Sequence, residues 1–181
     1  MKKIFSFIWE ISKIAIIAAL IVIPIRYFVF QPFIVKGQSM TPNFAEGDYL
    51  IIDEISYQFR GPQRGEVIVF KYPGDLSQKF IKRVVALPGE VVEIKEDRVR
   101  IYNGDRTQVL DESEYLPASV QTIGDTSFEL GEEEYFVLGD NRGFSYDSRR
   151  FGVVPRDNII GRFFFRIWGQ TPMTKFELPD Y

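Results

Sequence analysis

The pattern of apolar and polar positions divides the chain at about residue 30. Residues 14–25 read IAIIAALIVIPI, with no polar side chain, and more apolar and aromatic residues lie on both sides. As a helix this segment alone is about 18 Å long, against a hydrocarbon core of roughly 30 Å, so a membrane span must include its neighbours. We predict an N-terminal transmembrane anchor helix over residues 1–30.

Charged and aromatic residues around this segment indicate an orientation. Lys2, Lys3 and Lys13 favour a cytoplasmic N-terminus, and Trp9 and Tyr27 suit the two membrane interfaces. The rest of the chain would then lie on the extracytoplasmic face. Two other interpretations stay open. A cleaved secretory signal lacks an Ala-x-Ala site after the apolar run, and a buried or interfacial helix is favoured by the shortness of that run.

Beyond residue 31 the period changes to two, which is typical of half-buried strands. Short segments rich in β-branched and aromatic residues cover 49–52, 66–70, 80–85, 91–94, 98–102, 135–138 and 161–165. Turn residues separate them, and Asn103-Gly104 predicts a tight hairpin. We therefore predict a mainly β chain with an all-β, barrel-like or sandwich-like domain over residues 31–181. The more polar segment 103–131 is predicted to be a small insertion or subdomain.

Composition excludes several kinds of catalytic site. The chain has no cysteine and no histidine, which removes thiol nucleophiles, disulfide scaffolds, Ser-His-Asp triads and HExxH zinc helices. A hydrolase must then use Lys, Asp, Glu or Tyr as its base, or a hard metal ion. The first 30 residues hold four basic side chains and one acidic one, which leaves the rest of the chain net acidic. An acidic body argues against nucleic-acid binding.

A turn serine and a strand lysine are the candidate reactive groups. Ser39 lies in a predicted turn that leaves its hydroxyl outside the strand ladder. Lys82 shares its strand face with Phe80 and Val84, and apolar burial lowers the pKa of a lysine. Without such a shift, roughly 1 lysine in 2,500 is neutral at pH 7. Each residue also has an ordinary interpretation, as a turn serine and as an edge-strand lysine that discourages aggregation.

The other lysines and the polar loop 139–150 bear on which lysine is the candidate base. Lys36 and Lys79 are the remaining candidate bases, but Lys82 has the most apolar neighbours on its own face. The loop 139–150 directly follows a core-like strand. It is either an ordinary solvated loop or a support for a site, since its Asp and Arg residues can pair with one another and with Arg83.

Taken in order, these segments resemble the bacterial type I signal peptidases. The matching residues are Ser39-Met40-x-Pro42, Arg64-Gly65-Glu66-Val67-Ile68-Val69-Phe70, Lys82-Arg83-Val84 with Pro88-Gly89-Glu90, and Gly139-Asp140-Asn141-Arg142 with Ser145-x-Asp147-Ser148-Arg149. Any one of these motifs is weak. Four of them in this order, from the N-terminal anchor to about Gly161, make the resemblance specific.

The resemblance implies a membrane-bound serine endopeptidase that removes signal peptides from exported preproteins, with no metal or organic cofactor. Ser39 would be the nucleophile and Lys82 the general base, with Ser145 hydrogen-bonded to the lysine amine. The Ser39 N–H would be one oxyanion donor. The second donor stays open, because position 37 is glycine where some members of the family carry a serine hydroxyl.

The resemblance also implies the surroundings of the two residues. Asp147 would pair with Arg149, and Asp140 with Arg83. An extended peptide would add as a strand between residues 33–38 and the strand that ends at Lys82. Shallow apolar pockets there would accept small side chains at positions −1 and −3 of the signal peptide. The substrate-binding residues would be Phe33, Val35, Gly37, Met40, Phe44, Phe80 and Ile81.

The partners implied are preproteins that bear signal peptides, the lipid bilayer and, close by, the export translocase, with no nucleic acid. The expected location is the cell membrane, with a single pass. Two alternatives stay open. One is a specialised peptidase with the same Ser-Lys pair that processes a narrow set such as pilins or conjugation proteins. The other is a non-enzymatic, membrane-tethered β module in which Ser39 and Lys82 are only structural.

Overall fold

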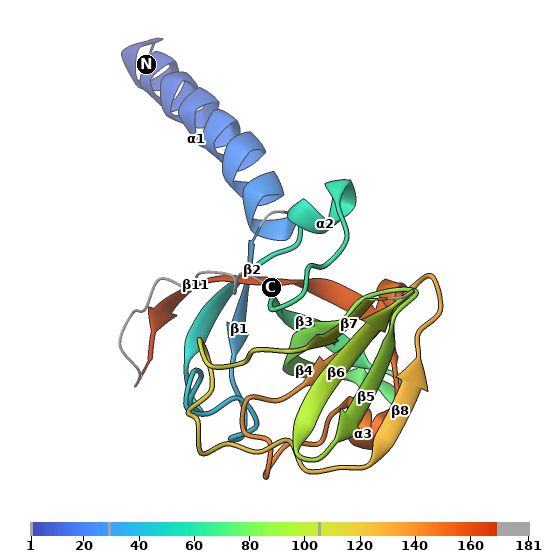
Figure 1. Ribbon diagram of the computed structural model, residues 1–181. Helices are drawn as coiled ribbons and strands as arrows, with labels where there is room; N and C mark the ends of the chain where they lie inside the picture. The colour runs from blue at the N-terminus through green and yellow to red at the C-terminus, as the bar shows by residue number, and fades with distance from the viewer. Residues whose placement is uncertain (1, 29, 105, 170–181) are drawn as a thin grey trace.

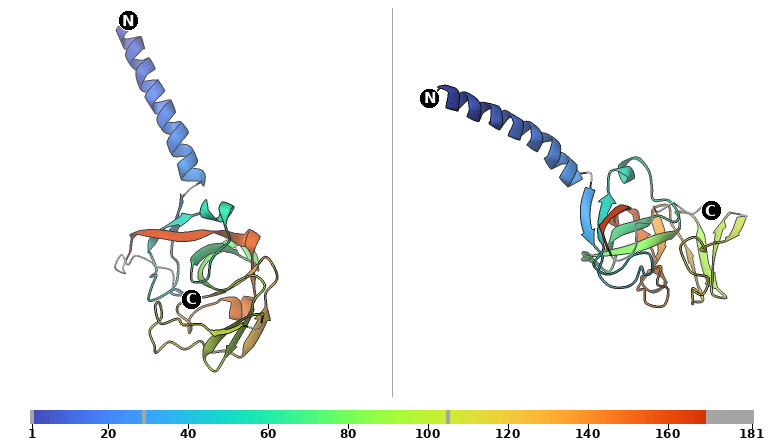
Figure 2. Two further views of the ribbon diagram at one scale, coloured as in Figure 1. Left: turned by 45° about the horizontal axis from the view of Figure 1, so that its top comes forward. Right: turned by 90° about the vertical axis from the view of Figure 1, so that its left-hand side faces the viewer.

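The computed structural model describes residues 2–28, 30–104 and 106–169. Within these ranges it describes the surroundings of every side chain except those of residues 2–5, 19, 21–28 and 30. One long helix, α1 (Lys2–Phe28), stands away from a body built of β-strands (Figures 1 and 2). In the described ranges the strands form two antiparallel sheets. The prediction of a mainly β chain is confirmed.

The larger sheet carries the two segments that hold Ser39 and Lys82. Its strand order is β1-β2-β11-β3-β4-β9-β10. The strands are β1 (Phe30–Ile34), β2 (Tyr49–Asp53), β3 (Val67–Tyr72), β4 (Asp75–Ala86), β9 (Glu134–Leu138), β10 (Val154–Pro155) and β11 (Ile159–Trp168). β4 pairs with β9 only from Arg83 onward. The earlier part of β4 therefore has one free edge.

The smaller sheet has the strand order β7-β6-β5-β8. It consists of β5 (Val91–Lys95), β6 (Arg98–Asn103), β7 (Arg106–Val109) and β8 (Thr126–Glu129). Asn103 pairs with Arg106, as expected of a hairpin at this turn. The division into an anchor, a catalytic domain and a subdomain at 103–131 stays a prediction. That segment contributes β7 and β8, whereas their sheet partners β5 and β6 lie before or at its start.

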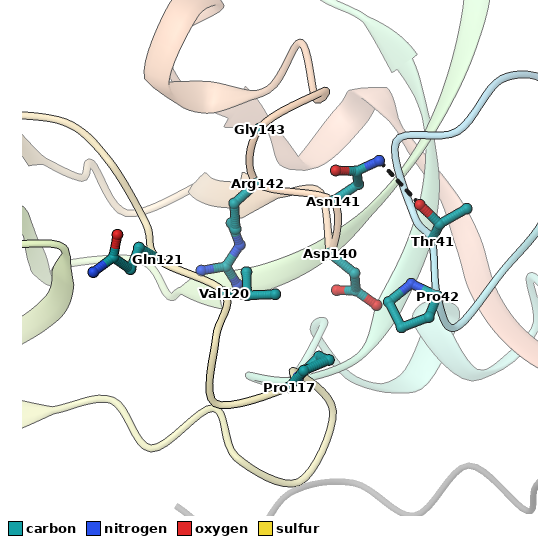
Figure 3. A pocket seen from close by; sticks show the side chains of 9 residues that line it. All are labelled: Thr41, Pro42, Pro117, Val120, Gln121, Asp140, Asn141, Arg142 and Gly143. Atoms are coloured by element: carbon teal, nitrogen blue, oxygen red, sulfur yellow. Dashed lines mark hydrogen bonds between the residues drawn. The ribbon is translucent and has the colours of Figure 1, made fainter.

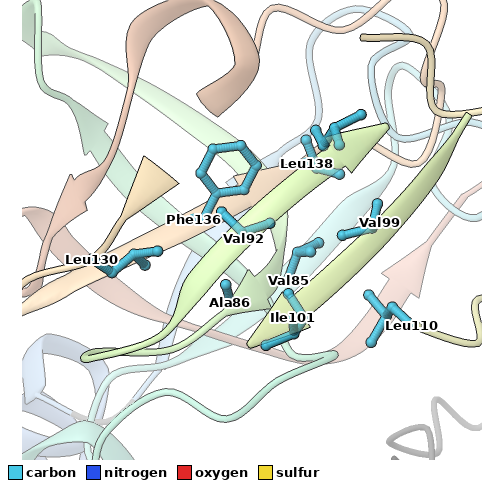
Figure 4. Packing of buried hydrophobic residues seen from close by; sticks show 10 residues of the cluster. Val85, Ala86, Val92, Val99, Ile101, Leu110, Leu130, Phe136 and Leu138 are labelled. Carbon is cyan, nitrogen blue, oxygen red and sulfur yellow. The ribbon is translucent and has the colours of Figure 1, made fainter. Parts of the chain in front are cut away.

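Apolar side chains join the two sheets in one core cluster (Figure 4). β4 and β9 contribute to it from the larger sheet, and β5 and β6 from the smaller one. Each member exposes at most 6% of its surface. The cluster consists of Val85, Ala86, Val92, Ile94, Val99, Ile101, Leu110, Leu130, Phe136 and Leu138.

Alternation along β3 and β4 sends side chains into two further clusters. Val67, Val69 and Ile81 belong to a cluster that also contains Val35 and Met40. Ile68, Phe70 and Val84 belong to a second cluster on the opposite face, and Phe80 packs against it. Since successive side chains of a strand point to opposite faces, Ile81 and Lys82 leave β4 in opposite directions.

Three short helices were not predicted from the sequence. They are α2 (Ser56–Phe59), α3 (Ser148–Phe151) and a 3₁₀ turn, η1 (Arg156–Asn158). They are too short to show a helical period. Two of them follow an aspartate that accepts hydrogen bonds from backbone N–H groups, a common way to start a helix. Asp53 accepts from Ser56 at 3.0 Å, and Asp147 accepts from Arg149 at 3.3 Å.

α1 covers the predicted anchor segment. It is 27 residues long, which corresponds to about 40 Å at 1.5 Å per residue. Within the residues that could be searched, no helix combines the length and the hydropathy of a membrane span. The side chain of Tyr27, predicted to lie near a membrane interface, is outside the described ones.

Candidate active site

Ser39 lies in the turn that follows β1. Gly37 begins this turn with a φ of +78°, in the left-handed region that favours glycine. Thr41 then closes it by donating its N–H to the Gln38 carbonyl at 3.3 Å. The buried Met40 side chain anchors the turn in the core. The turn therefore holds Ser39 half-buried, with its hydroxyl directed to β4.

Lys82 meets Ser39 across the cleft between this turn and β4. Its Nζ lies 2.8 Å from the Ser39 Oγ and 2.9 Å from the Ile81 carbonyl oxygen, and the residue is only 4% exposed. Burial lowers the pKa of Lys82 to about 8, although the carboxylates of Asp147 and Asp140 act to raise it. At that pKa about one lysine in ten is neutral at pH 7, so the amine can accept a proton from the hydroxyl.

Arg83 and Asp140 form a fully buried ion pair directly beside Lys82. The guanidinium Nε donates to Asp140 Oδ1 at 2.8 Å and Nη2 donates to Oδ2 at 2.6 Å, with both side chains 0% exposed. Its Nη1 donates to the Gly65 carbonyl, and the Asn43 amide donates to Asp140 at 2.8 Å. The Tyr115 ring lies 3.9 Å from the guanidinium carbon. These contacts attach the start of the 139–147 loop to β4.

Asp147 and Arg149 form a second pair at the other end of this loop. Arg149 donates to both carboxylate oxygens, at 2.8 Å and 2.9 Å, and Gly139 donates its N–H to Asp147 at 3.1 Å. Burial by itself raises the pKa of Asp147, but Arg149, together with the Ser145 hydroxyl and the Gly139 N–H, outweighs it and the pKa is lowered. Asp147 therefore stays ionised and ties the two ends of the loop together.

The predicted hydrogen bond from Ser145 to Lys82 is not formed, which corrects that expectation. The Ser145 Oγ is buried and makes no hydrogen bond to Lys82; it acts instead on the Asp147 carboxylate, whose pKa it helps to lower. Its hydroxyl packs over Gly139, where a Cβ would overlap it and would also lie 2.5 Å from the Ser39 carbonyl oxygen. The amine of Lys82 instead uses Ser39 and the Ile81 carbonyl.

Asn141 is a site residue to which the sequence analysis assigned no role. Its N–H donates to the Ser39 carbonyl at 3.0 Å, and its side-chain amide donates to the Gln38 carbonyl and the Thr41 hydroxyl, both at 3.0 Å. It therefore links the 139–147 loop to the turn that carries Ser39. The signal was present, because Asn141 lies within the Gly139-Asp140-Asn141-Arg142 motif.

A cleft of about 860 Å³ contains both reactive groups. Of the predicted substrate-binding residues, Phe33, Gly37, Phe80 and Ile81 line it. Val35, Met40 and Phe44 do not, because they are buried in the core below, so this part of the prediction is corrected. Its remaining lining residues are Pro32, Ile34, Lys36, Gln38, Ser77, Gln78, Lys79, Phe144 and Tyr146.

Comparison with known proteins identifies the family. The family described as signal peptidase, peptidase S26, matches residues 8–168. This chain belongs to that family. Ser39, Lys82 and the 139–147 loop all fall within the matched range, so the geometry above describes the central part of a signal peptidase family member.

Two relatives agree with this assignment in sequence. Signal peptidase I of Leptolyngbya laminosa is 39% identical over 163 residues, which cover 84% of this chain and 75% of the relative. Signal peptidase I V of Bacillus subtilis (strain 168) is 33% identical over 170 residues, which cover 89% and 96%. A crystal structure of a signal peptidase I from Enterococcus faecalis V583 is 33% identical, covers 57% of this chain and 97% of that one, and has a TM-score of 0.47.

A second hollow, of about 450 Å³, lies beside the site (Figure 3). Thr41 and Asn141 line it from the site, and Pro117 and Gln121 line it from the segment before β8. The 139–147 loop is attached to that segment by Arg142, which pairs with Glu112 and donates to the Thr122 hydroxyl.

Among the described residues, no group of three or more His, Cys, Asp or Glu side chains is placed to hold a metal ion.

Replacing Gly139 by alanine is expected to reduce peptidase activity by at least about tenfold, because the added Cβ displaces either Ser145 or the Ser39 backbone. The measurement is kcat/KM on a preprotein, together with urea unfolding to show that the variant is folded. Gly143→Ala in the same loop is the matched control, since a Cβ there meets nothing within 4 Å. Equal activities for the two variants would contradict the role given to Gly139.

Proposed function

We propose that this chain is a type I signal peptidase that uses Ser39 as its nucleophile and Lys82 as its general base. Membership of the signal peptidase family supports the reaction, the endoproteolytic removal of signal peptides from preproteins. The observation that carries the residue roles is the 2.8 Å approach of a buried amine to a hydroxyl inside the cleft.

The reaction proceeds by proton transfers between these two groups. Neutral Lys82 accepts the Ser39 hydroxyl proton as Oγ attacks the carbonyl carbon of residue −1. The tetrahedral intermediate collapses when Lys82 returns that proton to the amine of residue +1, which leaves as the new N-terminus of the mature chain. Water then gives a proton to Lys82 and attacks the ester on Ser39. Lys82 returns that proton to the Ser39 Oγ as the second tetrahedral intermediate collapses, which releases the signal peptide with a free carboxyl end and restores both groups.

The oxyanion of each tetrahedral intermediate is stabilised by hydrogen-bond donors. We assign the Ser39 N–H as one donor. Gly37 offers no side-chain hydroxyl that could be the second donor. A Cβ atom placed on Gly37 would meet nothing within 4 Å, so the space beside this residue is open. The space beside the oxyanion is therefore available to a water molecule or a shifted backbone N–H.

The peptide is bound as an added strand. β1 and its following turn offer one edge, and residues 77–82 of β4 offer the free edge that β9 does not cover. Main-chain hydrogen bonds then give affinity, and pockets for alternate side chains give specificity. The small residues at −1 and −3 face Ile81, whose side chain closes the floor of the cleft with the core beneath it.

We propose α1 as the single membrane anchor, with its N-terminus in the cytoplasm and the body on the extracytoplasmic face. The support is the apolar segment 14–25 with lysines before it, and a helix whose length exceeds the hydrocarbon core. The lipid bilayer is then a partner of the chain. The site is held near the membrane, where signal peptides leave the export translocase.

Substitution of either reactive residue tests the proposed roles. Ser39→Ala and Lys82→Ala are each expected to lower kcat/KM on a labelled preprotein by at least about 1,000-fold without unfolding the protein, because each removes one partner of the proton transfer. Lys82→Arg is expected to be equally inactive, since a guanidinium keeps its charge. The control is Lys95→Ala, an exposed lysine on β5. A folded Ser39→Ala protein with full activity would sink the proposal.

The pH dependence follows from the pKa of about 8 for Lys82. Because the neutral amine is the active form, kcat/KM rises about tenfold per pH unit below that pKa and levels off above it. The measurement is kcat/KM between about pH 6 and 10, with circular dichroism as a check on folding. A rate that falls across this range would point to a base other than a lysine.

Protease digestion tests the orientation of the anchor. Protease added to intact spheroplasts is expected to degrade the body, residues 31–181, because we place it outside the membrane. A cytoplasmic marker protein that stays intact serves as the control for lysis. Full protection of the body in spheroplasts, with degradation after detergent is added, would show the opposite orientation.

A further inference from the structure

The cleft has an aromatic wall that the mechanism above does not use. Phe144 and Tyr146, both from the 139–147 loop, line the cleft together with Ser39 and Lys82. Phe144 is 82% exposed, and Tyr146 is partly exposed. A large aromatic side chain left in solvent at the edge of a peptide-binding cleft is a candidate substrate contact, because burying it on binding is favourable.

The wall lies on one particular face of β4. Tyr72, at the end of β3, stacks on Phe80 with ring centroids 4.9 Å apart and planes at 16°. Tyr146 meets Tyr72 edge-on at 5.9 Å, and their hydroxyl groups are 3.3 Å apart. Lys82 shares this face, since its Nζ lies 5.3 Å from the centre of the Phe80 ring. Tyr146 therefore stands on the Phe80 and Lys82 face, and Phe144, two residues before it in the same loop, lines the same cleft.

The opposite face of β4 accommodates the small residues. Ile81 points away from Phe80 and Lys82 and packs with Val35 and Met40 in the core. In the proposed function, positions −1 and −3 of the signal peptide face this side. The core cluster below this face is closely packed, which fits the requirement for small side chains at −1 and −3.

The alternation of side chains along a strand then determines where the side chain at position −2, between positions −1 and −3, points. A peptide added to the free edge of β4 continues the pleat of the sheet, so side chains at −1 and −3 lie on one face and the side chain at −2 on the other. We propose that Phe144 and Tyr146 form a subsite for the side chain at −2, which selects an aromatic or branched aliphatic residue. This inference rests on the proposed function and adds a third specificity position to it.

The chemistry of the wall is apolar with two hydroxyl groups at its rim. Tyr146 is held by Tyr72 and by Phe151, whose ring centroid lies 5.7 Å from its own, so it is a firm surface. Phe144 is attached by its backbone, where its N–H donates to the Asn141 carbonyl at 3.0 Å, and its ring has room to fold over a bound side chain. An aromatic residue at −2 thus fits between a fixed ring and an adaptable one.

The test measures kcat/KM of the full chain in detergent on four peptides that differ only at −2. Each peptide has alanine at −3 and −1, and carries Phe, Leu, Gly or Asp between them. The wild-type protein is expected to prefer Phe over Gly by about fivefold to tenfold, with Leu between them. Phe144→Ala is expected to lower that ratio to about twofold, and Phe144→Ala with Tyr146→Ala to about one. Tyr146→Phe keeps the ring and is expected to keep the ratio.

The matched control is Phe59→Ala, because Phe59 is an equally exposed phenylalanine, at 84%, on α2 and does not line the cleft. This variant keeps both the activity and the preference at −2. Cleavage of all four peptides by the wild type at equal rates would overturn the subsite while the proposed function stands. A preference for Asp would assign the position to the cleft lysines and also overturn it. No cleavage of any peptide or preprotein would overturn both proposals.

Discussion

The chemistry of this site depends on the desolvation of one amine. In water a lysine keeps its proton at neutral pH, so it cannot take one from a serine hydroxyl. On β4 the Lys82 amine is buried between the Phe80 ring and the turn that carries Ser39, and burial penalises its charged form. In the proposed mechanism no histidine is needed, because a lysine with a lowered pKa serves as the base. β4 carries this amine, the turn after β1 places the Ser39 hydroxyl beside it, and the 139–147 loop holds the two nearby carboxylates.

Two carboxylates lie close enough to restore the charge on Lys82, and the arrangement limits their effect. Asp140 is held by Arg83 and Asp147 by Arg149, so each negative charge has a nearer positive partner than the amine. Lys82 and Arg83 are neighbours in sequence, but among the described residues only Arg83 forms an ion pair, with Asp140. Removing Asp140 would strand a buried guanidinium, and breaking such a pair costs about 3–5 kcal/mol. The ion pairs therefore give rigidity, and the lysine gives reactivity.

Local patterns in the sequence were sufficient to predict much of the fold and to single out Ser39 and Lys82, whose side chains the structure brings together. Strand alternation placed Lys82 among apolar neighbours, and the ordered motifs pointed to Ser39, which is 43 positions away. Features that depend on three-dimensional packing were missed. Phe144 and Tyr146 lie in a polar stretch, and the contact of Tyr146 with Tyr72 forms only when the chain folds. The hydrogen bond expected of Ser145 depended on a side-chain direction that sequence does not specify.

The contact between Arg142 and Glu112 couples the 139–147 loop to the segment that joins β7 and β8 of the smaller sheet. Glu112 lies in the segment between β7 and β8, so transient opening of that segment releases Arg142 and with it the middle of the 139–147 loop. Local opening of that segment therefore also loosens the loop. Among the described residues Ser39 and Lys82 lie outside the smaller sheet, yet the stability of the β7–β8 segment affects how firmly the loop beside them is held.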